Sequence, residues 1–118
     1  MPDRFPHPRS NRLLKRREFD QVFKLGSKQV GRHFVCYTVR REEPGNKLGM
    51  VVSRKVGKAV TRNRVKRYIR ECFRLHQGRF EMAVELVVVA RAEAAKLDSA
   101  ACERSLRQLL ERGGVIRG

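Results

Sequence analysis

Apolar residues recur three and four residues apart in three stretches of the chain, and this spacing predicts three helices. The first helix is expected over residues 13–25 and ends at a glycine, the second spans residues 61–76 and ends at Gln77-Gly78, and the third begins after Asp98. Asp98 is a residue type favoured at helix N-caps, and glycine is common just beyond a helix end. The apolar stripe of the third helix consists of Cys102, Leu106, Leu109 and Leu110.

Three other stretches have the composition of strands. Residues 34–39 are aromatic and β-branched, and residues 48–53 are a short apolar run. The turn-forming residues 42–46 lie between them, so we expect these two strands to form an antiparallel hairpin. Residues 84–90 are almost continuously apolar, which is typical of a central strand covered on both faces.

The elements therefore follow the order helix-strand-strand-helix-strand-helix, which predicts a single-domain α+β fold in which helices and sheet pack as an α–β sandwich. A length of 118 residues also suits one domain. We expect a flexible basic N-terminal arm over residues 1–11, where prolines interrupt any regular pattern. The rest of the chain is then expected to form one domain over residues 12–113, followed by a short tail over residues 114–118.

The charge of the chain is strongly positive, with 28 Lys and Arg against 12 Asp and Glu and a net charge of +16. Residues 1–76 carry 21 cations and 6 acids, a net of +15, whereas residues 77–118 carry 7 and 6, a net of +1. A small protein with this charge repels itself until a polyanion neutralises it. Nucleic acid is the first candidate partner and an anionic membrane surface the second.

The sequence offers no secretory or membrane signal, because its first ten residues lack an apolar segment and its longest apolar run is far too short to cross a bilayer. Cys36, Cys72 and Cys102 are far apart and odd in number, which argues against disulfides or a zinc site. We interpret them as small buried residues with reduced thiols, and the chain as cytoplasmic.

The most basic segment is residues 53–74, which contains nine cations and one acid. On a helical wheel one side is apolar, with Val65, Tyr68, Ile69, Cys72 and Phe73. The opposite side carries Asn63, Lys66, Arg67, Arg70 and Arg74. Three of the four charged pairs at four-residue spacing are repulsive, which a merely solvated helix would avoid. The pattern favours a helix that presents a cationic face to a polyanion.

Arginine predominates over lysine in this helix, and its planar fork suits phosphates and bases. Asn63 adds an amide that can both donate and accept hydrogen bonds. These features favour folded RNA, although a DNA recognition helix can have the same composition.

Phe19, Phe23 and Tyr37 form a second group of interest. Aromatic side chains beside cations can stack on the bases of single-stranded nucleic acid. Composition alone favours the simpler interpretation, in which these rings pack into the core.

No arrangement of residues in the sequence suits catalysis by the chain itself. The acids are scattered, and His7, His33 and His76 are dispersed. We find no general acid–base pair, no metal-ligand spacing and no phosphate-binding glycine loop.

The segment of residues 53–67, with Arg62-Asn63-Arg64 at its centre, resembles the signature of the protein subunit of bacterial ribonuclease P. Residues 14–26 are similar to the first helix of that family, residues 32–38 to its first strand and residues 86–91 to its third strand. The resemblance covers residues 12–110, and the central motif is long and ungapped.

The resemblance implies a ribosomal-protein-like fold with a left-handed crossover. It implies a ribonucleoprotein endoribonuclease in which a catalytic RNA, using Mg²⁺, removes the 5′ leader of precursor tRNA. The protein subunit would bind that RNA and the leader, with no metal site of its own, no membrane contact and no obligate protein partner.

The same resemblance implies roles for individual residues. The residues expected to bind the RNA subunit are Arg62, Asn63, Arg64, Lys66, Arg67 and Arg70. Those expected to bind the 5′ leader are Phe19, Phe23, Tyr37, Arg54, Lys55 and Arg91. One departure concerns Arg91, which family members often follow with Lys and Pro, whereas this chain has Ala92-Glu93.

Three alternatives use the same basic helix. The first is a ribosomal or assembly protein that binds ribosomal RNA. The second is a DNA-binding regulator, which is usually a dimer, and the sequence shows no clear dimerisation seam. Membrane-surface binding is the least favoured, because Phe73 and its neighbours are needed for the core.

Overall fold

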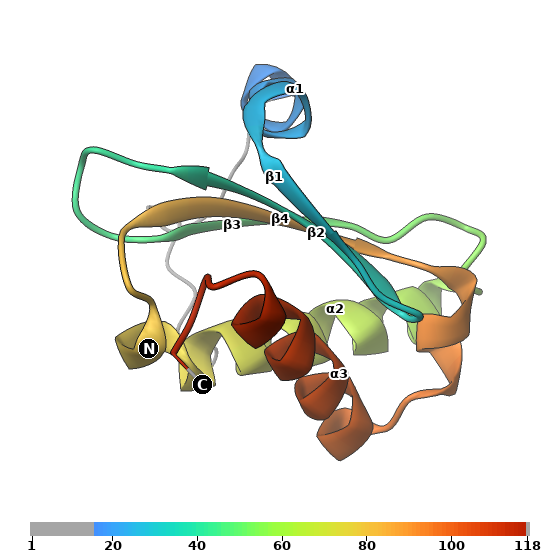
Figure 1. Cartoon of the computed structure of the whole chain (residues 1–118). Helices are drawn as coiled ribbons and strands as arrows, with labels where there is room; N and C mark the ends of the chain where they lie inside the picture. Colours follow the sequence, from blue (N-terminus) through green and yellow to red (C-terminus); the bar gives the residue numbers. More distant parts are fainter. Residues whose placement is uncertain (1–15, 118) are drawn as a thin grey trace, which may run out of the picture.

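The computed structural model describes residues 16–117, which form three α-helices around one four-stranded sheet (Figure 1). In chain order the elements are α1 (Arg16–Leu25), β1 (Ser27–Val30), β2 (Phe34–Arg40), β3 (Lys47–Val51), α2 (Ala59–Leu75), the 3-10 turn η2 (Gln77–Arg79), β4 (Val84–Ala90), the 3-10 turn η3 (Ala92–Lys96) and α3 (Ser99–Arg112). The predicted α+β fold is confirmed.

The strand order across the sheet is β1-β2-β4-β3. β2 is antiparallel to both β1 and β4, whereas β3 runs parallel to β4 and α2 makes the crossover between them. The predicted hairpin of the strands at residues 34–39 and 48–53 is therefore wrong. β4 lies between those strands, with Leu86 opposite both Thr38 and Leu48. An apolar strand is buried best at the centre, where both of its edges are paired.

The strand β1 has no counterpart among the predicted elements. Its sequence, Ser-Lys-Gln-Val, is polar and shows no clear alternation of apolar and polar residues. It pairs with β2 from Ser27 opposite Thr38 to Val30 opposite Val35, at the edge of the sheet. Strand formation here depends on backbone pairing with β2, which composition does not reveal.

The helices divide between the two faces of the sheet, with α1 on one face and α2 and α3 on the other (Figure 1). The main core lies between the sheet and the α2–α3 pair, and a smaller cluster centred on Val22 and Val87 lies under α1. β4 is buried along nearly its whole length, which confirms that it is the central strand. The predicted stripe of α3 is also buried, including Leu106 and Leu109.

The ends of α3 follow local rules. Asp98 Oδ1 accepts a hydrogen bond from the backbone N–H of Ala101 at 2.8 Å, so the predicted N-cap is confirmed. At the other end Gly114 has a φ of 71°, in the left-handed region that favours glycine. The chain then returns to the core. Val115 and Ile116 are buried, so the segment predicted as a tail completes the domain instead.

The predicted N-terminal arm over residues 1–11 and the start of the first helix at residues 13–15 lie outside the described residues. Within residues 16–117, no helix combines the length and apolar character needed to cross a membrane.

Candidate nucleic-acid interface

The amphipathic character predicted for α2 is confirmed. Val65, Ile69, Cys72 and Phe73 are buried against the sheet and α3, with at most 3% of each exposed. Tyr68 packs against the edge of this core. The opposite side of α2 is thereby fixed in an outward orientation.

The outward side of α2 borders an open groove of about 490 Å³. Its lining consists of Val60, Asn63, Arg64, Arg67 and Arg70, with no acidic side chain. Val60 is the most exposed large apolar residue of the described chain, at 78%. Three guanidinium groups, an amide and an apolar patch together suit the phosphates, sugars and base edges of RNA.

Arg62 and Arg64 also hold the fold together. Arg62 Nε donates to the carbonyl of Gly57 at 3.1 Å, which closes the loop before α2. Gly57 has a φ of 150°, and a Cβ there would lie 3.1 Å from Cβ of Thr61. Arg64 Nη2 donates to the carbonyl of Ala95 at 3.0 Å, while its buried Nε has no partner among the described residues. Neither Arg62 nor Lys66 lines the groove.

The three predicted aromatic residues meet on the other face of the sheet. The ring centroids of Phe23 and Tyr37 are 4.8 Å apart in an edge-to-face arrangement, and those of Phe19 and Phe23 are 6.5 Å apart. Lys28 Nζ lies 5.7 Å from the centre of the Tyr37 ring. Phe23 is 37% exposed, so the cluster presents aromatic surface beside a cation as well as packing against the sheet.

The aromatic cluster rests on strand residues that the sequence analysis did not single out. Val39, Val51 and Val89 are partly buried around Val22 and Val87, on the face that α1 covers. These positions alternate with core-facing residues along their strands, and this alternation is the signal that could have identified them.

The three cations expected to bind the leader, which we call the rim cations, follow two neighbouring strands. Arg54 and Lys55 are exposed beyond β3, and Arg91 is exposed directly after β4. Because β3 and β4 are parallel, these residues lie at the same edge of the sheet. Arg91 Nη1 donates to the carbonyl of Gly31 at 2.9 Å, which directs it toward the turn between β1 and β2.

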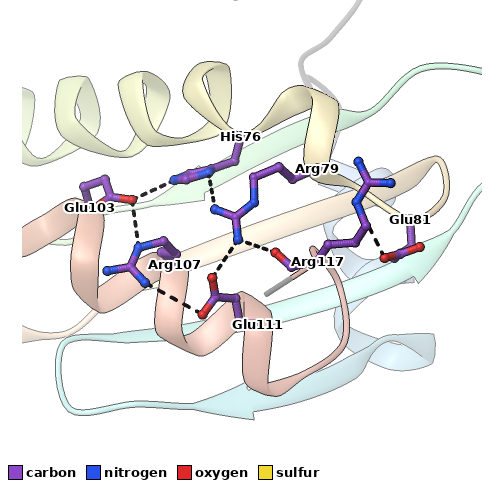
Figure 2. A network of polar contacts seen from close by, with 7 residues as sticks. All are labelled: His76, Arg79, Glu81, Glu103, Arg107, Glu111 and Arg117. Atoms are coloured by element: carbon purple, nitrogen blue, oxygen red, sulfur yellow. Dashed lines mark hydrogen bonds and ion pairs between the residues drawn. The ribbon is translucent and has the colours of Figure 1, made fainter.

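A group of possible metal ligands joins α2 to α3. Cys72, His76 and Glu103 have possible ligand atoms within 4.8 Å of one another. Figure 2 shows that His76 also contacts Arg79 and that Glu103 also contacts Arg107. Arg79 can only donate to His76 Nδ1, at 3.0 Å, so His76 Nε2 carries the proton that it shares with Glu103 at 2.7 Å. Burial raises the pKa of the Cys72 thiol well above its ordinary value.

These residues do not fit magnesium, which prefers oxygen ligands. Binding a metal at His76 Nε2 would also place a proton on Nδ1, facing the N–H of Arg79. His76 and Glu103 instead form a hydrogen-bonded link between the end of α2 and α3.

Comparisons with known proteins identify related chains. The sequence model of the family Ribonuclease P matches residues 7–114. A relative from Geobacillus kaustophilus, the ribonuclease P protein component, is 40% identical over 107 residues, covering 90% of this chain and 88% of the relative. The structure of the RNase P protein of Staphylococcus aureus is similar, with a TM-score of 0.85 and 34% identity over 91% of this chain and 98% of that one. The RNase P protein of Thermotoga maritima gives a TM-score of 0.78 with 34% identity, again over 91% and 98%.

Proposed function

The chain belongs to the ribonuclease P protein family, and we propose that its two surfaces hold two different RNAs at the same time. As a family member it is the protein subunit of the ribonucleoprotein endoribonuclease that forms the mature 5′ end of tRNA, with catalysis carried by RNA. The observation that carries the proposal is that α2 and α1 lie on opposite faces of one sheet (Figure 1). The groove borders α2, and the aromatic cluster lies between α1 and the sheet.

The α2 groove is proposed to bind the catalytic RNA subunit. Asn63, Arg64, Arg67 and Arg70 line it together, and the groove contains no carboxylate that would compete with phosphates. Arg62 and Lys66 flank this surface on the same helix. Binding of this kind depends strongly on salt, because each phosphate that is neutralised releases a counterion.

The aromatic cluster is proposed to bind the 5′ leader. Phe19, Phe23 and Tyr37 offer ring faces and edges to unpaired bases, and stacking tolerates any base sequence. The rim cations Arg54, Lys55 and Arg91, beyond the ends of β3 and β4, would contact phosphates of the same strand.

The chemistry itself is assigned to the RNA. Magnesium would be held by the RNA subunit, since the only group of three His, Cys, Asp or Glu ligands within residues 16–117 does not suit it. The protein contributes by holding the leader so that the scissile phosphate is correctly placed. This role puts the chain in the cytoplasm, a compartment in which its three free, buried cysteines stay reduced.

The proposal is tested by mixing the protein with in vitro transcribed ribonuclease P RNA at low magnesium concentration. We expect correct cleavage of precursor tRNA only when both are present. Absence of any stimulation, or purification of the protein with ribosomal RNA instead, overturns the proposal.

Variants separate the two surfaces. Charge reversal at Arg64 and Arg67 should weaken assembly with the RNA subunit. Phe19→Ala should leave assembly intact and weaken binding of precursor tRNA relative to mature tRNA. Unchanged discrimination in Phe19→Ala would show that the aromatic cluster does not hold the leader.

A further inference from the structure

α3 carries two polar stripes, one in which the charges are paired with each other and one that contains only cations and an amide. On one stripe Glu103, Arg107 and Glu111 alternate in sign, and Arg107 contacts both carboxylates, Glu103 at 3.2 Å and Glu111 at 3.7 Å (Figure 2). On the other stripe Arg104 and Arg112 flank Gln108 at the same four-residue spacing, with no carboxylate between them. The first stripe stabilises the fold through its own ion pairs, whereas the second leaves its cations available.

The second stripe forms one side of a pocket of about 280 Å³, which we call the α3 pocket. The turn between β1 and β2, with Gly31, Arg32 and His33, forms another side. Arg32, Arg104 and Arg112 all line the pocket, and no acidic residue does. Its apolar lining comes from Leu97, Ala101 and Leu109.

Contacts between the turn and α3 hold this pocket in shape. His33 Nδ1 and Ser105 Oγ are 2.9 Å apart, and Arg112 Nη2 donates to the carbonyl of Val30 at 2.7 Å. Arg91, directly after β4, also holds this turn, because its Nη1 donates to the carbonyl of Gly31. A pocket fixed in this way binds a ligand with a smaller loss of conformational entropy.

The arginines of the pocket keep donors for a ligand. Arg104 is exposed and has no hydrogen bond or ion pair with any residue in the range 16–117. Arg32 has 77% of its side chain exposed, and its one carboxylate partner, Glu93 at 3.6 Å, is shared with Lys96. Guanidinium groups that keep free N–H donors around an apolar patch are suited to phosphates beside a base or sugar.

We propose that the α3 pocket binds an unpaired strand of the catalytic RNA subunit, as a third RNA contact beyond the α2 groove and the aromatic cluster. Arg104 and Arg112 are eight residues apart, which is about 12 Å along the helix axis. A single phosphate reaches only one of them, whereas successive phosphates of a strand can contact both and Arg32 as well. A strand therefore satisfies the pocket better than a free mononucleotide.

The position of the pocket identifies which RNA reaches it. α3 lies on the same side of the sheet as α2, whereas α1 lies on the other side (Figure 1). The aromatic cluster proposed for the leader lies between α1 and the sheet. η3 connects the two cationic surfaces, because Ala95 accepts the hydrogen bond from Arg64 and Leu97 lines the α3 pocket. The inference rests on the proposed partnership with the RNA subunit.

The test measures binding of the full chain to ribonuclease P RNA over a range of salt concentrations. Arg104→Gln is the main variant, since Arg104 has no partner whose loss would disturb the fold. Arg32→Gln/Arg104→Gln is the second. Arg117→Gln is the control for charge, because it removes one cation with 62% side-chain exposure outside the pocket. Since Arg117 also contacts Glu81 and donates to the carbonyl of Gly78, the folded fraction of this variant is checked by urea denaturation.

We expect Arg104→Gln to weaken binding roughly threefold to tenfold, the equivalent of one net hydrogen bond to phosphate. The slope of log K against log salt should decrease by about 0.7 to 0.9 for each arginine removed. Arg117→Gln should retain the wild-type slope, and all variants should retain wild-type discrimination between precursor and mature tRNA.

Three results overturn the inference. Equal slopes for Arg104→Gln and Arg117→Gln would show that the α3 pocket is not in contact with the RNA subunit. Loss of discrimination between precursor and mature tRNA would assign the pocket to the leader. Binding of adenosine monophosphate as tight as that of a short oligonucleotide would indicate a site for free nucleotides. Failure of the wild-type protein to bind ribonuclease P RNA at all would instead contradict the proposed function.

Discussion

Arg64 of α2 donates a hydrogen bond from Nη2 to the carbonyl of Ala95 in η3, at 3.0 Å. This contact joins the groove proposed for the RNA subunit to the segment that leads into α3. One residue of the most basic helix thus contributes both to the RNA-binding surface and to the packing of the fold, whereas Arg67, one turn further along, is exposed.

The difference between these arginines predicts different effects of the same substitution. Arg64→Gln should lower the free energy of unfolding by about 1 kcal/mol, because the carbonyl of Ala95 loses its donor. Arg67→Gln should cost less than Arg64→Gln, because Arg67 is exposed and its contact is with the Tyr68 ring, 5.3 Å from the ring centre. Both variants should weaken binding to ribonuclease P RNA. Urea denaturation and RNA titration of the two proteins check this. Equal stability of the two variants would contradict the structural role of Arg64.

Phe23 is the aromatic residue best suited to test the proposed leader site, since it is 37% exposed and its ring is 4.8 Å from Tyr37. Phe23→Ala should weaken binding of precursor tRNA to the holoenzyme by about 1–3 kcal/mol, the value of one stacked base. Binding of mature tRNA should not change. Leu25→Ala is the matched control, because Leu25 is an apolar residue of the same helix with 63% exposure. An equal loss in both variants would rule out stacking.

The closed ring of contacts through His76, Glu103, Arg107, Glu111 and Arg79 is predicted to stabilise the fold without affecting RNA binding (Figure 2). Glu103→Ala removes the partner of both His76 and Arg107, so we expect a loss of about 1–3 kcal/mol in the free energy of unfolding.

Glu93→Ala serves as the control for this prediction. Among the described residues, Glu93 takes part only in exposed ion pairs with Arg32 and Lys96, so its removal should cost about 0–1 kcal/mol. Both variants should be compared by urea denaturation. RNA affinity is compared between Glu103→Ala and the wild-type protein only, because removing Glu93 also releases Arg32 of the α3 pocket. If Glu103→Ala changes the affinity for RNA under conditions in which the variant is fully folded, the ring of contacts also contributes to RNA binding.

The buried thiols predict how stability depends on pH. Burial raises the pKa of Cys36 and of Cys102 to about 12, from an ordinary value of 9.0. Above pH 9 the unfolded chain loses these protons while the folded chain keeps them, so the free energy of unfolding should fall as pH rises from 9 toward 12. Each such thiol contributes up to about 1.4 kcal/mol per pH unit.

Cys36→Ala tests this assignment, because it removes one of these groups. Denaturation between pH 8 and pH 11 should show a shallower decline for the variant than for the wild-type protein, whatever its absolute stability. Parallel curves would contradict a raised pKa for Cys36.

The local elements and the chemical character of the main surfaces follow from the sequence alone. The apolar stripe of α2, with Val65 and Ile69 at its centre, is fixed by spacing alone, and so is the N-cap at Asp98. The resemblance carried by Arg62-Asn63-Arg64 also identified the family correctly. These features are local, so neighbouring residues suffice to specify them.

Which segments are neighbours depends instead on long-range packing, and the sequence did not predict it. The order β1-β2-β4-β3 places the most apolar strand at the centre and separates two strands that are consecutive in sequence. Residues 115 and 116 join the core although they follow the last helix. Pairing and burial of this kind depend on contacts between residues far apart in the chain, which no local pattern records.

The charge distribution illustrates the same limit. The C-terminal residues 77–118 have a net charge of only +1, yet their helix α3 divides its charges between a self-neutralised stripe and one with uncompensated arginines. The net charge of a segment does not distinguish these two faces of α3, because the charge of a surface depends on which side chains the fold brings together.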